Sequence, residues 1–349
     1  MPIKGSFLKL PAALAITSMV SLLTHSVPVS AGAAQVRTQA PGFYRMMLGD
    51  FEITALLDGT HPFPAAEVLT KVKAGASGGR LKLFEGFAEE ASALLAASDL
   101  TAPMEGSINA FLINTGDKLI LIDSGAGTLY GSCCGHLIEN LRASGYRPEQ
   151  VDEVLLTHLH ADHVGGIAPG GTAAFPNAVI RSSKLDADYW LSEAHEKSAP
   201  DFLRSMFEGD KASLKPYIAA GRYSPFEGEQ EMEPGIRAIP LPGHTPGHTS
   251  YAIESRGQKL LVWGDVVHVA AIQFPDPSVT VKYDSDEGQA AVDRERIFSD
   301  AVKGGYWIGA AHISFPGLGH VGERNGAFVW IPGDYTTRMS VTPVIGQAK

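Results

Sequence analysis

The chain has 349 residues, of which 44% are hydrophobic and 19% are charged, the balance of an ordinary globular protein with ample core. Its formal net charge of −10 repels phosphate backbones, which argues against nucleic acid as a partner. The two cysteines, Cys133 and Cys134, are adjacent, so no disulfide framework supports the fold. We expect a pair of free thiols on a helix, with a strained vicinal disulfide as the alternative.

The first 33 residues have the pattern of a secretory signal peptide. Two lysines form a basic start, residues 10–23 are largely apolar, and Ala31-Gly32-Ala33 offers a small-residue cleavage site. The apolar run is shorter than the ~20 residues that a membrane span needs, so we expect export rather than a stable membrane anchor. The remaining domain, residues 34–349, would then be periplasmic or secreted.

In the first half of this domain the hydrophobic pattern predicts strands that lead to one histidine-rich turn. Residues 43–54 alternate enough for a hairpin, and residues 110–122 predict two short strands before Asp123. A helix is expected over residues 134–144, and the next strand ends at Leu156.

The second half repeats the order of strands followed by helices. We expect a strand at 178–182, helices at 186–196 and 202–220, strands at 236–239, 250–253 and 259–263, a helix at 287–302 and a strand at 306–311. Two strand-rich halves that each carry late helices suit a layered α+β fold.

The segment THLHADHVGG, residues 157–166, packs three imidazoles and one carboxylate into six positions after an apolar strand. Because a strand carries side chains i and i+2 to the same side, His158 and His160 can bind one ion together. Asp162 and His163 follow where the chain turns, and the glycine pair lets them face a second ion. Zinc and similar metals favour imidazole nitrogen and carboxylate oxygen. A surface cluster of histidines is the alternative.

Three later segments carry further candidate ligands. PGHTPGH places His244 between residues that permit unusual backbone angles. An apolar strand over residues 260–263 ends in Gly-Asp and presents the carboxylate of Asp265 at its tip. AAHISFP repeats this device with His312.

With these four motifs in this order, the chain resembles the metallo-β-lactamase superfamily from about Ala40 to Pro332. Within it, the chain looks most like methyl parathion hydrolase and its lactonase-like relatives. Residues 40–56 are similar to the first strands of that group, and residues 270–274 and 314–320 to its late segments. The resemblance implies a four-layer αββα sandwich with two metals at one edge, and a homodimer.

The resemblance also implies ligands shared between two ions: His158, His160 and His244 on one, Asp162, His163 and His312 on the other, and Asp265 bridging both. Zinc is the expected ion, with manganese, cobalt and iron as alternatives. Two ions about 3.5–4 Å apart can share a water and lower its pKa from 15.7 to about 7. They also stabilise charge on a substrate oxygen. Asp162 is a candidate proton shuttle to the leaving oxygen.

This ligand set favours hydrolysis over other chemistries of the superfamily. A thiolate ligand, typical of many zinc β-lactamases, has no candidate because both cysteines lie far from the motifs. Redox di-iron relatives usually place glutamate where His160 stands, so oxygen reduction is disfavoured.

Positions of the substrate wall follow from the shared segments, and most are aromatic or aliphatic, which suits a flat apolar substrate. They are Phe63, Val68, Tyr130, Trp190, Phe207, His268 and Tyr283. Each aromatic alone is more often a core residue. Val68 and His268 stand where methyl parathion hydrolase carries arginine and leucine. His268 could hydrogen-bond a lactone or ester oxygen, or be a packed histidine at a strand end.

The remaining candidates are less informative. We expect solvent-exposed positions for His61, His136 and His195, and outer or turn positions for His248 and His320. Asp123, at a strand end, is expected to orient ligands or loops rather than to bind metal.

The expected function is that of a dinuclear metal-dependent hydrolase. It would attack a small cyclic or aryl ester with a metal-bridging hydroxide, as a lactonase or arylesterase, with a side activity on aryl phosphotriesters. The alternative is an organophosphorus hydrolase of the methyl parathion type. An iron-dependent oxygenase on the same scaffold and a purely metal-binding or structural protein are the remaining hypotheses.

Overall fold

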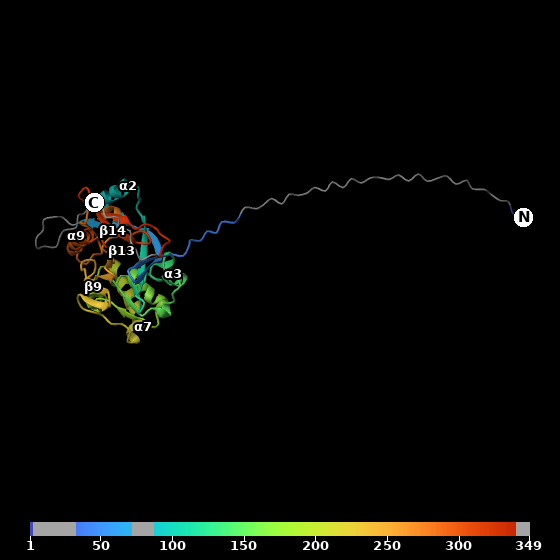
Figure 1. Ribbon diagram of the computed structural model, residues 1–349, viewed down its shortest axis with the longest axis horizontal. Helices are drawn as coiled ribbons and strands as arrows, with labels where there is room; N and C mark the ends of the chain where they lie inside the picture. The colour runs from blue at the N-terminus through green and yellow to red at the C-terminus, as the bar shows by residue number, and fades with distance from the viewer. Residues whose placement is uncertain (3–32, 72–86, 340–349) are drawn as a thin grey trace. The chain divides into compact units, whose positions relative to one another are not determined.

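The computed structural model describes residues 1–2, 33–71 and 87–339, and the chain divides into two units, residues 1–39 and 40–349. The predicted signal peptide lies almost wholly outside the described residues. In the described part, every helix and strand belongs to the second unit (Figure 1). No helix among these residues is long and apolar enough to span a membrane.

The first sheet has six strands in the order β1-β2-β4-β5-β6-β7. They are Phe43–Leu48, Phe51–Phe63, Met104–Asn114, Leu119–Ile122, Glu153–Leu155 and Val179–Arg181. The predicted hairpin is confirmed by the antiparallel pairing of β1 and β2. β5, β6 and β7 run parallel, so their carboxyl ends lie along one edge.

The second sheet has seven strands in the order β15-β14-β13-β11-β10-β9-β8. They are Ala327–Pro332, Leu318–Arg324, Trp307–Gly309, Gln258–Val262, Thr249–Ser255, Ile236–Pro240 and Gln230–Glu233. Strands β8, β14 and β15 were not predicted. β8 and the far half of β14 are polar, and two glycines interrupt the β14 pattern, so neither strand shows a clear hydrophobic period.

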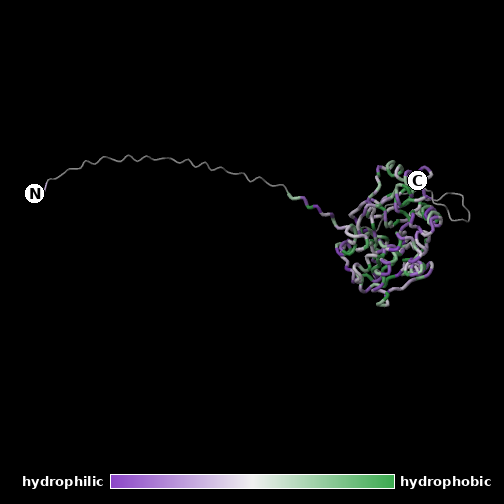
Figure 2. The backbone as a smooth tube through the Cα atoms, turned by 180° about the vertical axis from the view of Figure 1, so that it is seen from behind, coloured by the Kyte–Doolittle hydropathy of each residue, from purple (hydrophilic) through white to green (hydrophobic). Residues whose placement is uncertain are grey.

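Each strand of the first sheet divides its side chains between two layers. Along β4, Ala110 and Leu112 face one cluster, with helices α3 (Leu137–Ala143), α5 (Lys184–Trp190) and α7 (Asp201–Ala219). Phe111 and Ile113 face the opposite cluster, which they share with strands of the second sheet. Figure 2 shows the resulting interleaving of polar and apolar residues along the backbone.

Helix α9 (Glu287–Gly304) completes the sandwich on the outer face of the second sheet. Ile297 and Phe298 of this helix pack with Leu261 and Trp263. The layers are therefore helix, sheet, sheet and helix, and the predicted α+β sandwich of four αββα layers is confirmed.

A smaller unit stands beside the sandwich and was not predicted. Strand β3 (Leu69–Lys71) pairs with β12 (Val279–Val281). Helices α1 (Ala65–Val68), α2 (Phe87–Ala97) and α8 (Ala270–Gln273) surround the pair. Its own apolar cluster includes Leu69, Leu95 and Val281. We call this group of elements the side unit.

Two predicted helices differ in the structure. The helix expected from residue 134 begins at Leu137. Cys133 ends a 3₁₀ turn and Cys134 has extended backbone, so neither lies on the helix. Their sulfur atoms are 2.8 Å apart, and both thiols are free. The helix expected over residues 186–196 is broken. The break lies at Ser192. The Ser192 hydroxyl accepts a hydrogen bond from the His195 amide and so caps a new helix, α6 (Glu193–Ser198).

Candidate metal centre

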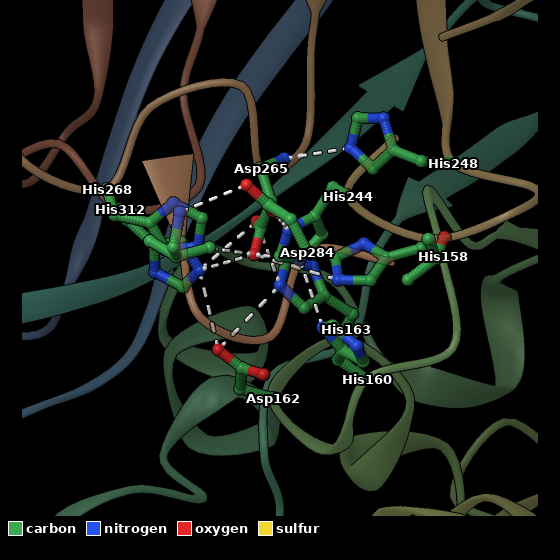
Figure 3. A network of polar contacts seen from close by, with 12 residues as sticks. His158, His160, Asp162, His163, His244, His248, Asp265, His268, Asp284 and His312 are labelled. Carbon is green, nitrogen blue, oxygen red and sulfur yellow. Dashed lines mark hydrogen bonds and ion pairs between the residues drawn. The ribbon is translucent and has the colours of Figure 1, made fainter. Parts of the chain in front are cut away.

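The predicted ligands converge from separate segments of the chain, where strands of both sheets end (Figure 3). The first histidine motif follows β6 and enters the short helix α4 (Ala161–Val164). The other ligands follow β9, β11 and β13. All are at least nine-tenths buried: His158, His160, Asp162, His163, His244, Asp265 and His312.

Glycines allow this approach at two places. A Cβ at Gly166 would lie 1.8 Å from the carbonyl oxygen of Ser124, so only glycine lets the first motif fold against the loop after β5. Gly264 has a φ of +61°, and its Cβ would lie 2.5 Å from His248 Nε2. This close contact lets that nitrogen accept a hydrogen bond from the Asp265 amide at 3.0 Å.

The ligand atoms fall into two groups, each within 4.8 Å. One contains His158, His160, His244 and Asp265, and the other Asp162, His163 and His312. These are the two sets that the resemblance implied. A third group joins His268 to Asp265 and His312.

Asp265 lies between the two groups. Its Oδ2 is 3.2 Å from Nε2 of His244 and 3.1 Å from Nε2 of His268. Its Oδ1 is 3.1 Å from Nε2 of both His163 and His312. Nε2 of His312 lies 3.2 Å from Oδ2 as well. With Oδ2 beside His244 of the first group and Oδ1 beside His163 of the second, the carboxylate lies where a ligand shared by two cations would lie.

Buried atoms without hydrogen-bond partners test whether metals fit here. Within the part of the chain that the structure describes, Nε2 of His158, His160 and His163 and Oδ1 of Asp265 make no hydrogen bond. Leaving a buried polar atom unsatisfied costs about 1–3 kcal/mol. Cations in the two groups would satisfy all four atoms, and imidazole with carboxylate suits zinc and related divalent ions. The residues fit a dinuclear centre.

Burial and neighbouring charges set the protonation states of these ligands. Burial lowers the pKa of His158 and His160 well below the usual value, so both rings are neutral, the form that binds metal. Burial opposes ionisation of Asp265, but His163 and His312 outweigh it and hold its pKa well below the usual range. Burial lowers the pKa of His163, but Asp265 and Asp123 raise it well above its usual value. A cation at His163 would therefore displace a proton.

Asp123 orients the second group, as predicted. Its Oδ2 lies 2.9 Å from His163 Nδ1, and its Oδ1 accepts from the Thr157 amide at 2.8 Å. This fixes the ring so that Nε2 faces Asp265.

Two other histidines of the ligand groups have hydrogen-bond partners outside those groups, and neither partner was predicted from the sequence. Nδ1 of His312 lies 2.9 Å from the carbonyl oxygen of Ser107, and Nδ1 of His244 lies 2.6 Å from Oδ1 of Asp284. Asp284 is 40 residues from its partner and follows no motif, so no local signal could have identified it.

Predictions for the remaining histidines have mixed outcomes. His136 and His195 are exposed, as expected, and His248 lies behind Asp265, also as expected. His61 is half-buried rather than solvated, because its ring packs on Phe63 and Tyr130 at 6.0 and 5.7 Å. His320 lies on β14 against Trp307, at the far end of β13, and is neither an outer ligand partner nor a turn residue.

Four of the predicted wall residues surround the two groups. The hydroxyl of Tyr130 donates to Oδ1 of Asp162 at 3.2 Å. Phe63 stacks near His268 at 6.1 Å, and the Tyr283 ring lies 5.7 Å from His268. His268 is buried, and its ring points at Asp265.

The other three wall residues lie further back. Trp190 packs behind His160, with ring centroids 5.0 Å apart, and Phe207 packs on Trp190 at 4.6 Å. Both belong to the core under α7. Val68 is buried, and its carbonyl accepts from the Lys282 amide at 2.9 Å, which ties α1 to the Tyr283 segment. For these three residues, contact with substrate stays a prediction.

Curated relatives match part of the chain. An N-acyl homoserine lactonase of Bacillus cereus is 27% identical over 158 residues, which is 45% of this chain and 55% of the relative. Another N-acyl homoserine lactonase, of a Bacillus species, is 32% identical over 119 residues, or 34% and 39% of the two chains. The matches therefore span about half of these relatives or less.

Solved structures match more of the chain. AbOPH, a hydrolase in the beta lactamase superfamily, is 36% identical, with a TM-score of 0.76, over 86% of this chain and 100% of its own. AidC, a dizinc quorum-quenching lactonase in complex with a product, is 25% identical, with a TM-score of 0.72, over 84% and 98%. The model of the metallo-beta-lactamase superfamily matches residues 103–305. This match covers more than half of the sequence, so the chain belongs to the metallo-beta-lactamase superfamily.

Proposed function

We propose that this protein is a dinuclear metal-dependent hydrolase that opens lactones or cleaves aryl esters of small apolar substrates. The observation that carries the proposal is Asp265, whose two oxygens face two groups of buried ligands. The similarity to N-acyl homoserine lactonases and to AidC, a dizinc lactonase, supports both the reaction and zinc as the ion.

The proposed reaction divides between the ions and the side chains. Two divalent ions, when bound, supply a water of lowered pKa and polarise the carbonyl oxygen of the ester. Asp162 belongs to the second ligand group: its Oδ2 lies 3.4 Å from His312 Nε2, and its Oδ1 accepts a hydrogen bond from the wall residue Tyr130. We assign Asp162 to take a proton from this water as the water oxygen adds to the ester carbonyl carbon, and to pass the proton to the leaving oxygen as the carbon–oxygen bond breaks, which yields an acid and an alcohol.

The aromatic wall supports an apolar substrate. Phe63, Tyr130 and Tyr283 place three aromatic rings around the ligand groups. Aromatic rings bury a flat acyl or aryl group well and leave one polar bond to the ions. Aryl phosphotriesters have the same flat leaving group, so a side activity on them belongs to the proposal.

Comparative kinetics tests the substrate class. We expect kcat/KM for dihydrocoumarin-type lactones or acyl-homoserine lactones to exceed that for methyl paraoxon. His268→Leu should narrow the difference, because it removes the imidazole beside Asp265. A wild-type preference for the phosphotriester, unchanged in the variant, would reverse our ranking of substrates.

Metal analysis tests the reaction class. Asp162→Asn should keep two ions but lose turnover. A fully loaded protein that is inactive on esters, lactones and phosphotriesters would indicate a metal-binding or structural role. One iron per chain with oxygen uptake would indicate an oxygenase.

We further propose that the protein is exported after removal of residues 1–33 and acts as a homodimer in the periplasm or outside the cell. The basic and apolar pattern of the N-terminal sequence supports export. N-terminal sequencing of the protein from fractionated cells and light scattering of the purified protein test these two points.

A further inference from the structure

We propose that Asp284 is a positioning residue that holds His244 for one ion of the centre and joins that ligand to the substrate wall. The inference rests on the proposed dinuclear function and assigns a role to a residue outside every motif. Figure 3 shows Asp284 beside His244 in the network.

The contact between the two side chains is short and shielded from water. Oδ1 of Asp284 lies 2.6 Å from Nδ1 of His244, and the two side chains are 1% and 3% exposed. With Nδ1–H donating to this carboxylate, the lone pair of Nε2 faces Asp265 and the first ligand group. Asp284 therefore sets both the tautomer and the direction of the ring.

Asp284 is itself fixed by its own segment. Its Oδ2 accepts from the amide of Val281 at 3.0 Å, and its amide donates to the Val281 carbonyl at 2.9 Å. The following residue, Ser285, donates its amide to the His244 carbonyl at 3.0 Å. The backbone of this segment is thus hydrogen-bonded to the backbone that carries the ligand.

The same segment carries part of the substrate wall. The Tyr283 ring lies 5.8 Å from His244 and 6.1 Å from His160. The preceding strand, β12, belongs to the side unit. Tyr283 and Asp284 are neighbours in one segment, so a substrate that contacts Tyr283 contacts the segment that also orients His244. This part of the substrate wall and one metal ligand are therefore held by the same segment.

The second ligand group has a different support. Asp123 holds His163 from the end of β5, in the main sandwich, and its other oxygen accepts from Thr157. In the first group, the hydroxyl of Thr157 lies 3.0 Å from Nδ1 of His158. The same hydroxyl donates to Asp123, which therefore reaches the first group through Thr157. Asp284 contacts a ligand of the first group alone, so a change at Asp284 can weaken that group without the other.

The central test uses Asp284→Asn, with Asp286→Asn as the matched control. Asp286 lies in the same loop, but its side chain caps α9 by accepting from the Gln289 amide, and asparagine caps helices equally well. Competition with a chromophoric chelator measures the two zinc affinities. We expect Asp284→Asn to weaken one ion about 10–100-fold and leave the other unchanged, since outer partners have effects of this size. The control should retain both affinities.

Two further measurements make the test decisive. The visible spectrum of the Co²⁺-loaded variant should change for one of two equivalents. In zinc-loaded wild type, NMR of ¹⁵N-labelled histidine should show two Nδ1–H signals with the downfield shift of a strong hydrogen bond to carboxylate, one for His163 beside Asp123 and one for His244 beside Asp284. This second measurement does not depend on the variant folding.

The outcomes separate this inference from the proposed function. Wild type that binds fewer than two ions would overturn the dinuclear function itself. Two tight ions in wild type, with equal affinities in Asp284→Asn and Asp286→Asn, would overturn the role of Asp284 and leave the function standing.

Discussion

The sandwich and the side unit contribute differently to the site. Most ligands stand where strands of the sandwich end, and two layers of apolar residues hold those strands in place. Much of the wall stands on or beside the side unit, which has its own small core. The position of the metal-binding atoms therefore depends on the main core, whereas the shape of the wall depends on elements attached to it.

The largest expected effect comes from removal of the Asp265 carboxylate, which lies at the end of a sandwich strand and is shared by both ligand groups. Asp265→Ala should lose both ions and at least about 1,000-fold in kcat/KM, because metal catalysis supplies several kcal/mol of transition-state stabilisation. Elemental analysis and kinetics measure the two losses. Retention of two tight ions in the variant would contradict the bridging position of Asp265.

A second variant tests a buried contact that links the sandwich to the side unit. The guanidinium of Arg294, on α9, is buried and donates to the carbonyls of Val266, Pro277 and Val279, which links the segment after Asp265 to β12. Arg294→Met removes the Arg294 donor from all three carbonyls, although that of Val279 still accepts from the Gln273 side-chain amide at 3.0 Å. With two buried carbonyls deprived of this donor, we expect a loss of about 3 kcal/mol in the free energy of unfolding. Urea denaturation measures it.

Arg296→Met provides the control for this variant. Arg296 is half-exposed and pairs with Asp293 on the same helix, an interaction worth about 1 kcal/mol or less. Equal losses for the two variants would contradict the role of Arg294 as a link between the two regions.

Truncation of the wall should affect binding more than chemistry. Tyr283→Ala removes an aromatic ring near both His160 and His268, and we expect KM to rise about tenfold with little change in kcat. The metal content should stay at two ions. A selective loss of kcat would place Tyr283 in the chemical step instead.

The smallest expected effect concerns the pH dependence of stability, through Glu287 at the start of α9. Burial, with the charges of Asp284 and Asp286, raises the pKa of Glu287 to about 7, against a usual value of 4.5. The folded protein therefore holds this proton more tightly than the unfolded chain, so stability should fall as pH rises from about 4.5 through 7. Glu287→Gln should make this slope shallower in thermal unfolding measured across that range. An unchanged slope would exclude Glu287 as its source.

Regularly patterned elements could be predicted from the sequence, and irregular ones could not. The apolar run Ala110–Ile113 predicted a strand within residues 110–122, and this run is the second half of β4; the first half, from Met104, was not predicted. β3 and β12 have three residues each, too short to show a period, and they exist because they pair with each other across about 210 positions.

The sequence alone predicted the layered fold and, through the family resemblance, a set of candidate ligands that the structure brings together in two groups. These candidates stand in compact motifs beside apolar strands, although His158 and His160 follow β6 and do not lie on a strand as expected. The outer groups that orient those ligands, and the residues that surround them, depend on how distant segments meet in the folded chain. The contacts of Asp284 with His244 and of Ser107 with His312 join positions 40 and 205 residues apart. A hydrogen bond of this kind requires proximity in space and leaves no periodic pattern in the chain.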